Sequence, residues 1–192
     1  DCSYADWLMS GHAPASTVGN HPLPVVGPAT HFVSHAWGFN FQMFMRSLRS
    51  YVSTSTTAEE KANGIYFWID IFVVDQHAAA RGDMDESYWE TTFRSMVNQI
   101  GHTVMVLDHL PTSMPTVLGR IWCIWELHST ISSKKNLLSV ALDDEAGVSE
   151  AVRETKLVHD LLSQIQNIKS ADAQATVESD RDKINRLVAA SD

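Results

Sequence analysis

The segment Trp122-Cys123-Ile124-Trp125-Glu126-Leu127 places one carboxylate among two indoles and a thiol. It lies inside a stretch from Thr116 to about Ser132 that is typical of a buried helix. An ionised carboxylate in such apolar surroundings costs several kcal/mol, roughly, unless it is paired or faces a polar cleft. A carboxylate held in a cleft can stabilise positive charge that develops during a reaction. Glu126 is therefore the first candidate for chemistry, and the alternative is an ordinary Glu on a helix surface.

The neighbours of Glu126 offer aromatic surface and a thiol. Trp122 and Trp125 are three residues apart and could stack on a flat ring of a ligand, although for Trp125 a place in the core is the preferred interpretation. Cys123 could act as a nucleophile. No His–Asp partner stands at a readable spacing from it, so buried packing is the preferred interpretation for this thiol.

Histidine and aspartate residues form a second group of candidates. His31 and His35 are four apart in a predicted strand, which places them about 13 Å from each other and excludes a shared metal ion. His35, at the end of that strand, is the better candidate for a ligand contact. Asp70, Asp75 and His77 could supply oxygen and imidazole ligands for a metal-assisted hydrolase, which is one alternative function. Their spacing matches no sharp metal signature, and we prefer a loop that lines a ligand pocket.

Composition limits the class of protein. A chain of 192 residues with 44% apolar residues can bury the core of one domain. Its formal charge of −9 opposes nonspecific attraction to nucleic acid or to an anionic membrane. The two cysteines, Cys2 and Cys123, suit a reducing compartment, so we expect a cytoplasmic protein. The sequence contains no run of about 18 apolar residues, which is the length that a membrane-spanning helix needs.

The elements that must position these residues follow from hydrophobic periodicity. Residues 1–29 are rich in Gly and Pro and predict an irregular N-terminal arm, and residues 30–192 alternate in type. The expected strands cover 30–36, 65 to about 70, 103–107, 137–142 and, least clearly, 167–169. The expected helices cover 41–52, 89–100, 116–132, 152–165 and 177–190.

Five strands that alternate with five helices predict an α/β fold with right-handed crossovers and a parallel sheet between helix layers. The layout is a flavodoxin-like three-layer sandwich with a five-stranded parallel sheet in the order 2-1-3-4-5. Ligands of such sheets bind beyond the carboxyl ends of the strands. This places His35 and Trp37, the loop from Asp70 to His77, and the start of the helix that carries Glu126 on one rim.

Three runs of residues resemble one known family. They are His31-Phe32-Val33-Ser34-His35-Ala36-Trp37, Phe67-Trp68-Ile69-Asp70, and Arg120-Ile121-Trp122-Cys123-Ile124-Trp125-Glu126-Leu127. Together they resemble the Toll/interleukin-1 receptor (TIR) domain. In that family the first strand ends in a short loop that contains Ser, the second ends near an Asp, and a Trp-Cys-x-x-Glu-Leu element opens the third helix. The resemblance covers roughly Thr30 to Ala190 and indicates a divergent, TIR-like sequence.

The resemblance implies an activity. Family members are either enzymes that cleave NAD or modules that only assemble signalling complexes, and the Glu that the enzymes share falls on Glu126. It implies a TIR-like NAD glycohydrolase that releases nicotinamide and ADP-ribose or cyclic ADP-ribose, in immune or cell-death signalling. NAD is then a substrate rather than a cofactor, and self-association through TIR–TIR contacts is expected. The alternative from the same family is a noncatalytic assembly module.

The chemistry can also be argued without the family. Nicotinamide leaves NAD as a neutral group, so no acid has to protonate it, and the transition state resembles the oxocarbenium ion of glycoside hydrolysis. One carboxylate beside the ribose could stabilise that charge, which is the role expected of Glu126. A glycine-rich phosphate loop is absent from the sequence. The residues expected to shape the pocket are His35, Trp37, Phe72, Asp75 and Trp122.

Overall fold

A computed structural model describes residues 2–12, 17–18, 21–22, 24–83, 86–108, 115–142, 172–175 and 178–189. Within these ranges the strands are β1 (Thr17–Val18), β2 (His21–Pro22), β3 (His31–Ser34), β4 (Phe67–Trp68), β5 (His102–Leu107) and β6 (Leu137–Leu142). The helices are α1 (Tyr4–Trp7), α2 (Phe41–Ser55), α3 (Ala58–Asn63), α4 (Asp70–Val73), α5 (Gln76–Arg81), α6 (Glu86–Ile100), α7 (Ile121–Ile131) and α9 (Glu178–Ala189), with a π-helical turn η1 (Leu8–His12) and a 3-10 turn η2 (Thr116–Gly119).

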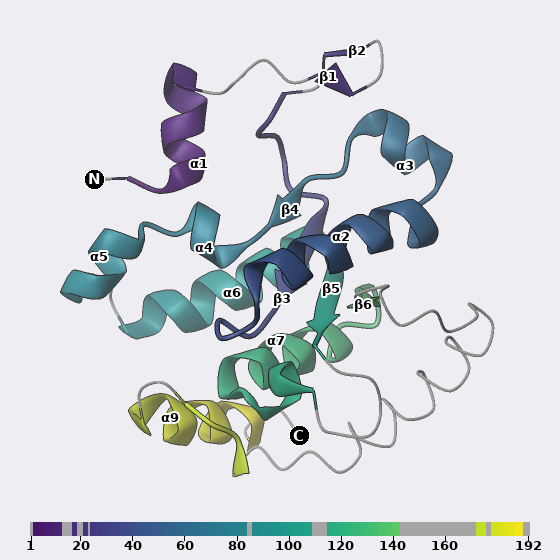
Figure 1. Cartoon of the computed structure of the whole chain (residues 1–192). Coiled ribbons are helices and arrows are strands. Elements are labelled where there is room, and N and C mark those ends of the chain that lie inside the picture. Colours follow the sequence, from purple (N-terminus) through teal and green to yellow (C-terminus); the bar gives the residue numbers. More distant parts are fainter. Residues whose placement is uncertain are drawn as a thin grey trace.

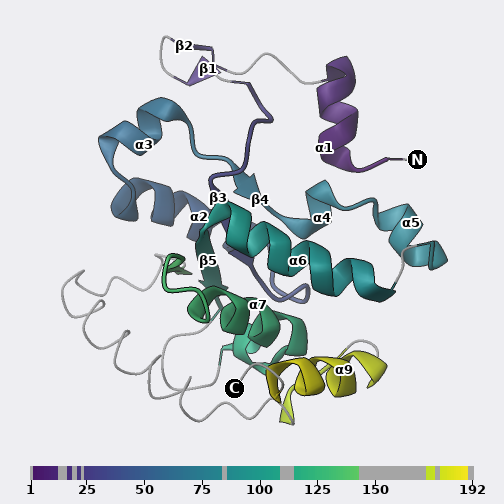
Figure 2. The ribbon, with the colours of Figure 1, turned by 180° about the vertical axis from the view of Figure 1, so that it is seen from behind.

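The centre of the fold is a parallel sheet in the order β4-β3-β5-β6. Helix α2 lies on one face of this sheet, and α6 and α7 lie on the other (Figures 1 and 2). The predicted α/β class, the parallel sheet and the 2-1-3-4 part of the strand order are therefore confirmed. The predicted strand at 167–169 and the predicted helix at 152–165 fall outside the described residues, so the sheet that the structure describes has four strands and not five.

Side-chain alternation along the strands builds the two halves of the core. Val33 and Val104 are register partners and pack on the α2 side with Phe44 and Leu48. The adjacent residues point the other way, because successive residues of a strand face opposite sides of a sheet. Phe32 accordingly packs with α6, and the residues of β5 on the same face pack with α7. No described helix has the length and apolarity needed to cross a membrane.

The second strand is shorter than its sequence indicates. The apolar run from Ile65 predicts a strand that continues to about Asp70, whereas only Phe67 and Trp68 pair with β3. Asp70 instead begins helix α4, where its Oδ1 accepts a hydrogen bond from the backbone N–H of Ile71 at 2.8 Å. A β-branched run favours a strand only where a neighbour is present to pair with it. The chain turns here, and Asp70 comes to lie at the end of the sheet.

The helix predicted over 116–132 is divided at Arg120. This residue has an extended backbone and forms an isolated parallel bridge with Gln174. The backbone N–H of Ile121 donates to Gln174 O at 3.0 Å, and Gln174 N donates to Gly119 O at 2.7 Å. A distant segment of chain therefore interrupts the apolar run, and α7 begins one turn before Glu126.

The N-terminal arm is ordered around α1 and lies beside α4. Ser3 caps α1, and Leu8 in the following turn is buried. The ring of Tyr4 lies 5.9 Å from the ring of Phe72 in α4. Residues 4–12 thus form short helical turns beside α4, where the sequence predicts irregular chain (Figure 1).

Two histidines lie close together at the amino ends of β3 and β5. The rings of His31 and His102 are 4.4 Å apart, and His102 Nε2 lies 2.8 Å from Ser139 Oγ. His31 Nδ1 lies 2.8 Å from Thr30 Oγ1, and its buried Nε2 has no partner among the described residues. Burial, reinforced by the neighbouring His102, lowers the pKa of His31 from 6.5 to about 4. Burial also lowers the pKa of His102.

We expect acid to destabilise the fold through His31. Its folded pKa lies below the unfolded value, so the unfolded chain binds the proton more tightly. The stability contribution is complete above about pH 6.5 and is lost as the pH falls toward about 4, by on the order of 2 kcal/mol. Urea unfolding at a series of pH values should show this decline, and H31Q should flatten it while lowering stability at neutral pH.

The matched control is H77Q, which changes an exposed histidine at the start of α5. Its pH profile should match that of the native protein. A decline of the same size in H31Q and in the native protein would show that His31 is not the titrating group.

Candidate functional site

Glu126 lies on α7 and is removed from solvent, with only 6% of its surface exposed. Its Oε2 is buried and has no hydrogen-bond partner among the described residues. Burial raises the pKa of the Glu126 carboxyl well above 4.5, and the negative charge of Asp70 raises it further. The alternative of an ordinary surface Glu is therefore wrong. The structure holds a carboxyl that favours its neutral form and has unused hydrogen-bonding capacity.

Ser34 lies opposite this carboxyl at the end of β3 and is completely buried. It shares a face with Phe32 and pairs with Met105, which packs against Cys123 of α7. The Ser34 hydroxyl lowers the pKa of Glu126 and so opposes the effect of burial. Its Oγ nevertheless forms no hydrogen bond of regular geometry with any described residue. The two buried groups are thus close enough for the hydroxyl to act on the carboxyl, without a hydrogen bond of regular geometry between them.

Asp70 joins the loops that follow β3 and β4. Its Oδ2 accepts a hydrogen bond from Trp37 Nε1 at 2.6 Å, and its Oδ1 lies 3.7 Å from His35 Nδ1. Cys123 Sγ donates to the backbone oxygen of His35 at 3.3 Å, which ties the start of α7 to the same place. The fold-based prediction that these three segments meet on one rim is confirmed. Sequence reasoning placed Asp70 in a pocket-lining loop and missed its role in joining the segments.

His35 and Trp37 differ in exposure. The His35 side chain is buried against Phe44, with ring centroids 4.8 Å apart. Burial lowers the pKa of His35, and the charge of Asp70 acts in the opposite direction. Trp37 is 58% exposed, although its indole N–H is held by Asp70. Trp37 therefore offers an aromatic surface at the rim, whereas His35 supports the rim from inside.

Cys123 is a poor candidate for a nucleophile. It is buried, and burial together with the nearby Glu126 raises the pKa of its thiol well above 9.0. Only the thiolate is an effective nucleophile. The interpretation of Cys123 as a packing residue agrees with this environment. Trp125 is 1% exposed, as its interpretation as a core residue predicts.

The other predicted pocket residues have partners away from the Glu126 carboxyl. Trp122 Nε1 donates to Asp180 Oδ2 at 3.0 Å and so ties α7 to α9. Asp75 caps α5 by accepting from the backbone N–H groups of His77 and Ala78, which lowers the pKa of Asp75. Both have structural roles that explain their positions, and their predicted contact with substrate stays a prediction.

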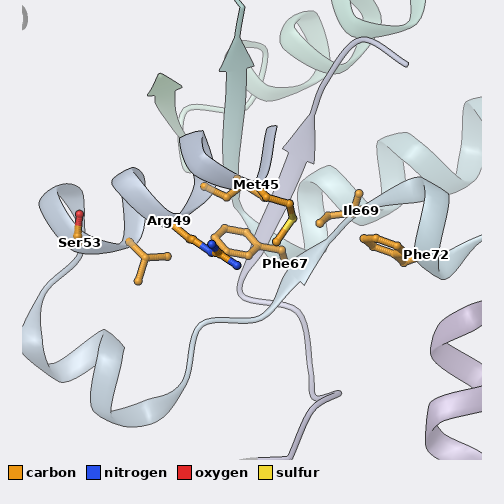
Figure 3. Close-up of a pocket in the computed structure, with 8 residues that line it drawn as sticks. Met45, Arg49, Ser53, Phe67, Ile69 and Phe72 are labelled. Atoms are coloured by element: carbon orange, nitrogen blue, oxygen red, sulfur yellow. The ribbon is translucent and has the colours of Figure 1, made fainter. Parts of the chain in front are cut away.

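Phe72 belongs to a different surface. Its ring lies 6.4 Å from that of Phe41, and it lines a cavity of about 310 Å³ between α2 and β4 (Figure 3). Glu126 does not line this cavity. The cavity and the Glu126 carboxyl are therefore separate features of the structure.

The proposed metal ligands are engaged elsewhere. Asp70 is bonded to Trp37 and Asp75 caps a helix. Within the described ranges no three His, Cys, Asp or Glu side chains are grouped so that they could hold a metal ion. The part of the chain that the structure describes offers this alternative no support.

Comparisons of the chain with models of known protein families, with curated proteins and with solved structures found no match. Inferences about function therefore rest on the site itself.

We expect E126Q to stabilise the protein increasingly as the pH rises. Because the folded pKa of Glu126 is raised, its contribution to stability is complete below about pH 4.5 and is lost as the pH rises through the folded value. The amide cannot ionise, so E126Q should match the native protein near pH 4.5 and exceed it by about 1–3 kcal/mol near pH 8. Urea unfolding at both pH values measures this difference.

E59Q is the matched control, because Glu59 is exposed in the first turn of α3. It should change stability by less than about 0.5 kcal/mol at either pH. Equal pH dependence in E126Q and in the native protein would mean that the buried carboxyl does not titrate as its burial requires.

Proposed function

We propose that the protein is a TIR-like NAD glycohydrolase in which Glu126 stabilises the ribosyl cation. The observation that supports this most is the buried Oε2 of Glu126, which lies without a described partner in the middle of α7, close to Ser34 at the carboxyl end of β3. That position is at the carboxyl rim of a parallel sheet, where ligands of such folds bind. The Trp-Cys-x-x-Glu-Leu motif, the strand order and the neighbouring Ser34 support the same proposal. For the fold, we also propose a fifth parallel strand at 167–169.

The reaction needs little from the protein beyond a well-placed negative charge. The bond between ribose C1′ and the nicotinamide nitrogen breaks, and its electron pair leaves with the ring, which becomes neutral. The ribose is left as an oxocarbenium-like cation, which water or a group of the substrate itself then attacks to give ADP-ribose or its cyclic form. A carboxylate in a low-dielectric site stabilises that cation far more strongly than it would in water.

The raised pKa of Glu126 is compatible with this role. The nicotinamide ring of NAD carries a positive charge before cleavage, and a nearby positive charge favours the ionised form of a carboxyl. Binding of the substrate would thus lower the pKa of Glu126 and produce the charge where it is used. The Ser34 hydroxyl acts in the same direction, because it already lowers that pKa in the free protein.

The rim residues have assigned roles in this proposal. The exposed indole of Trp37 offers a stacking surface for one of the substrate bases. His35 and Asp70 hold the two loops together beneath it. Phe72, Asp75 and Trp122 belong to the elements around the rim, and their proposed part is to shape its outer edge.

A noncatalytic assembly module is the second candidate, and one surface favours it. Tyr4, Trp7, Trp37 and Phe41 are each more than 40% exposed. The rings of Tyr4 and Phe41 both contact Phe72, so an aromatic surface runs from the arm to the start of α2. Exposed apolar patches of this kind are typical of protein–protein contacts. A second copy bound there would explain the surface without any catalysis.

Replacing Glu126 should abolish most NAD cleavage. Under concentrated conditions that allow self-association, we expect the native protein to release nicotinamide from NAD. In E126Q the rate of release should be lower by about a hundredfold or more, because an electrostatic group that acts on the transition state has been removed. Chromatographic measurement of nicotinamide gives both rates.

E59Q should retain the native rate, because it removes a carboxylate of the same kind from an exposed position. Circular dichroism establishes that each variant is folded. Equal background turnover by native protein and E126Q, in samples that do self-associate, would reject the enzyme and leave the assembly module.

The pH dependence of cleavage should move when Ser34 is changed. Because kcat/KM reports groups of the free enzyme, it should rise with pH through the raised pKa of Glu126. S34A removes the hydroxyl that lowers this pKa, so the rise should occur at higher pH than in the native protein. Initial rates at low NAD concentration across the pH range measure the shift.

S129A is the control. Ser129 lies on α7 and, like Ser34, is a buried serine whose Oγ has no described partner. Its profile should coincide with the native one. An unchanged profile in S34A would show that the Ser34 hydroxyl does not act on the ionising group.

A further inference from the structure

The cavity between α2 and β4 has a chemistry of its own. Its volume is about 310 Å³, and most of its lining is apolar. The lining residues are Met45, Leu48, Arg49, Val52, Ser53, Phe67, Ile69 and Phe72. Figure 3 shows it extended along α2, with Ser53 at one end, Ile69 and Phe72 at the other, and the guanidinium of Arg49 between them, beside Phe67. The polar side chains of the lining therefore lie between the Ser53 end, called here the polar end, and the middle, and the opposite end is hydrophobic.

Positive charge gathers at the polar end. Arg49 is exposed, and its guanidinium has no hydrogen bond or ion pair with the rest of the described chain. The ammonium of Lys61 reaches the same end, because Lys61 Nζ donates to the backbone oxygen of Ser53 at 3.0 Å. The Ser53 hydroxyl is already bonded to Ser50 O at 2.8 Å. One cation thus lines the apolar hollow and a second is bonded to the backbone of a lining residue, in a chain whose formal charge is −9.

This arrangement selects for one kind of molecule. An apolar ligand would gain no attraction from the cations, and a multiply charged anion would be repelled by the acidic protein as a whole. A molecule with an apolar body and one anionic head matches both ends. The volume is at the lower limit of the usual range for small-molecule sites, which favours a short chain over a long one.

We propose that the α2–β4 cavity binds a medium-chain carboxylate, with its head at Arg49 and Lys61 and its chain toward Ile69 and Phe72. Burial of the chain supplies the main attraction. Arg49 adds a charge-assisted hydrogen bond that fixes the direction of the molecule. Glu126 takes no part, so the proposal stands whether or not the protein cleaves NAD.

The test is calorimetric titration of the native protein with decanoate, and with decanol as an uncharged molecule of similar chain length. Decanoate should bind with one-to-one stoichiometry and at least tenfold more tightly than decanol. R49Q should weaken decanoate binding about tenfold and leave decanol unchanged. R186Q removes an exposed arginine of α9 and should have no effect on either ligand.

A second variant probes the apolar end of the proposal. V52W fills the cavity from α2, where Val52 is half-buried, and should abolish binding of both ligands while circular dichroism shows an unchanged fold. If V52W does not fold, the comparison of R49Q with R186Q decides alone.

Three results would overturn the proposal. Equal affinity for decanoate and decanol would remove the role of the cations. Decanoate binding that neither R49Q nor V52W changes would place the ligand elsewhere. Self-association of the native protein that V52W abolishes, without any binding of decanoate, would assign the cavity to a contact between copies of the chain.

Discussion

The packing of α7 on the sheet is the constraint on which the site depends. Cys123 and Leu127 of α7 pack with Met105 of β5, and fully burying apolar side chains of this size favours folding by roughly 1.5–3 kcal/mol each. Glu126 is adjacent to Leu127 and is drawn out of water with it. The carboxyl can meet this cost by remaining protonated, which explains the direction of its pKa. Its reactivity in the proposed reaction is therefore a consequence of how the helix is anchored.

Asp70 provides a second constraint of the opposite kind. Its carboxyl accepts hydrogen bonds from Trp37 and Ile71, so its partners are supplied by the two loops that it joins. The charge of Asp70 raises the pKa of Glu126. Two carboxyl groups near one rim thus have different surroundings, one hydrogen-bonded and one unpartnered. The surroundings of Glu126 therefore favour its neutral form, in the absence of any hydrogen bond to its Oε2 from the described residues.

The sequence predicted those parts of the fold that depend on local periodicity. The ranges of α6, β5, β6 and α9 follow directly from apolar spacing, and the rim follows from the strand order. It did not predict the length of β4 or the interruption at Arg120, because each is set by a partner far along the chain. For the same reason the contact of Trp122 with Asp180, 58 residues away, could not be foreseen.

Two features of the site, the position of Ser34 and the capping role of Asp75, could have been predicted from the neighbouring sequence. Ser34 follows Phe32 by two residues, so strand alternation alone places it on the face that α7 covers. Asp75 precedes two backbone N–H groups that it caps, and Asp at the start of a polar helical segment is a common N-cap. In both cases the side chain first meets a requirement of its own helix or strand.

The rim formed by the loops after β3 and β4 links the two proposed functions. Phe41 lies on the exposed aromatic surface, and it and the exposed Trp37 are close in sequence to His35, which is tied to Asp70 and Cys123. A partner that binds this surface more tightly when the rim is open would shift the population toward a state in which the carboxyl is accessible. Assembly and catalysis would then share one element, so the exposed aromatic residues and the buried carboxyl need not be explained by separate functions.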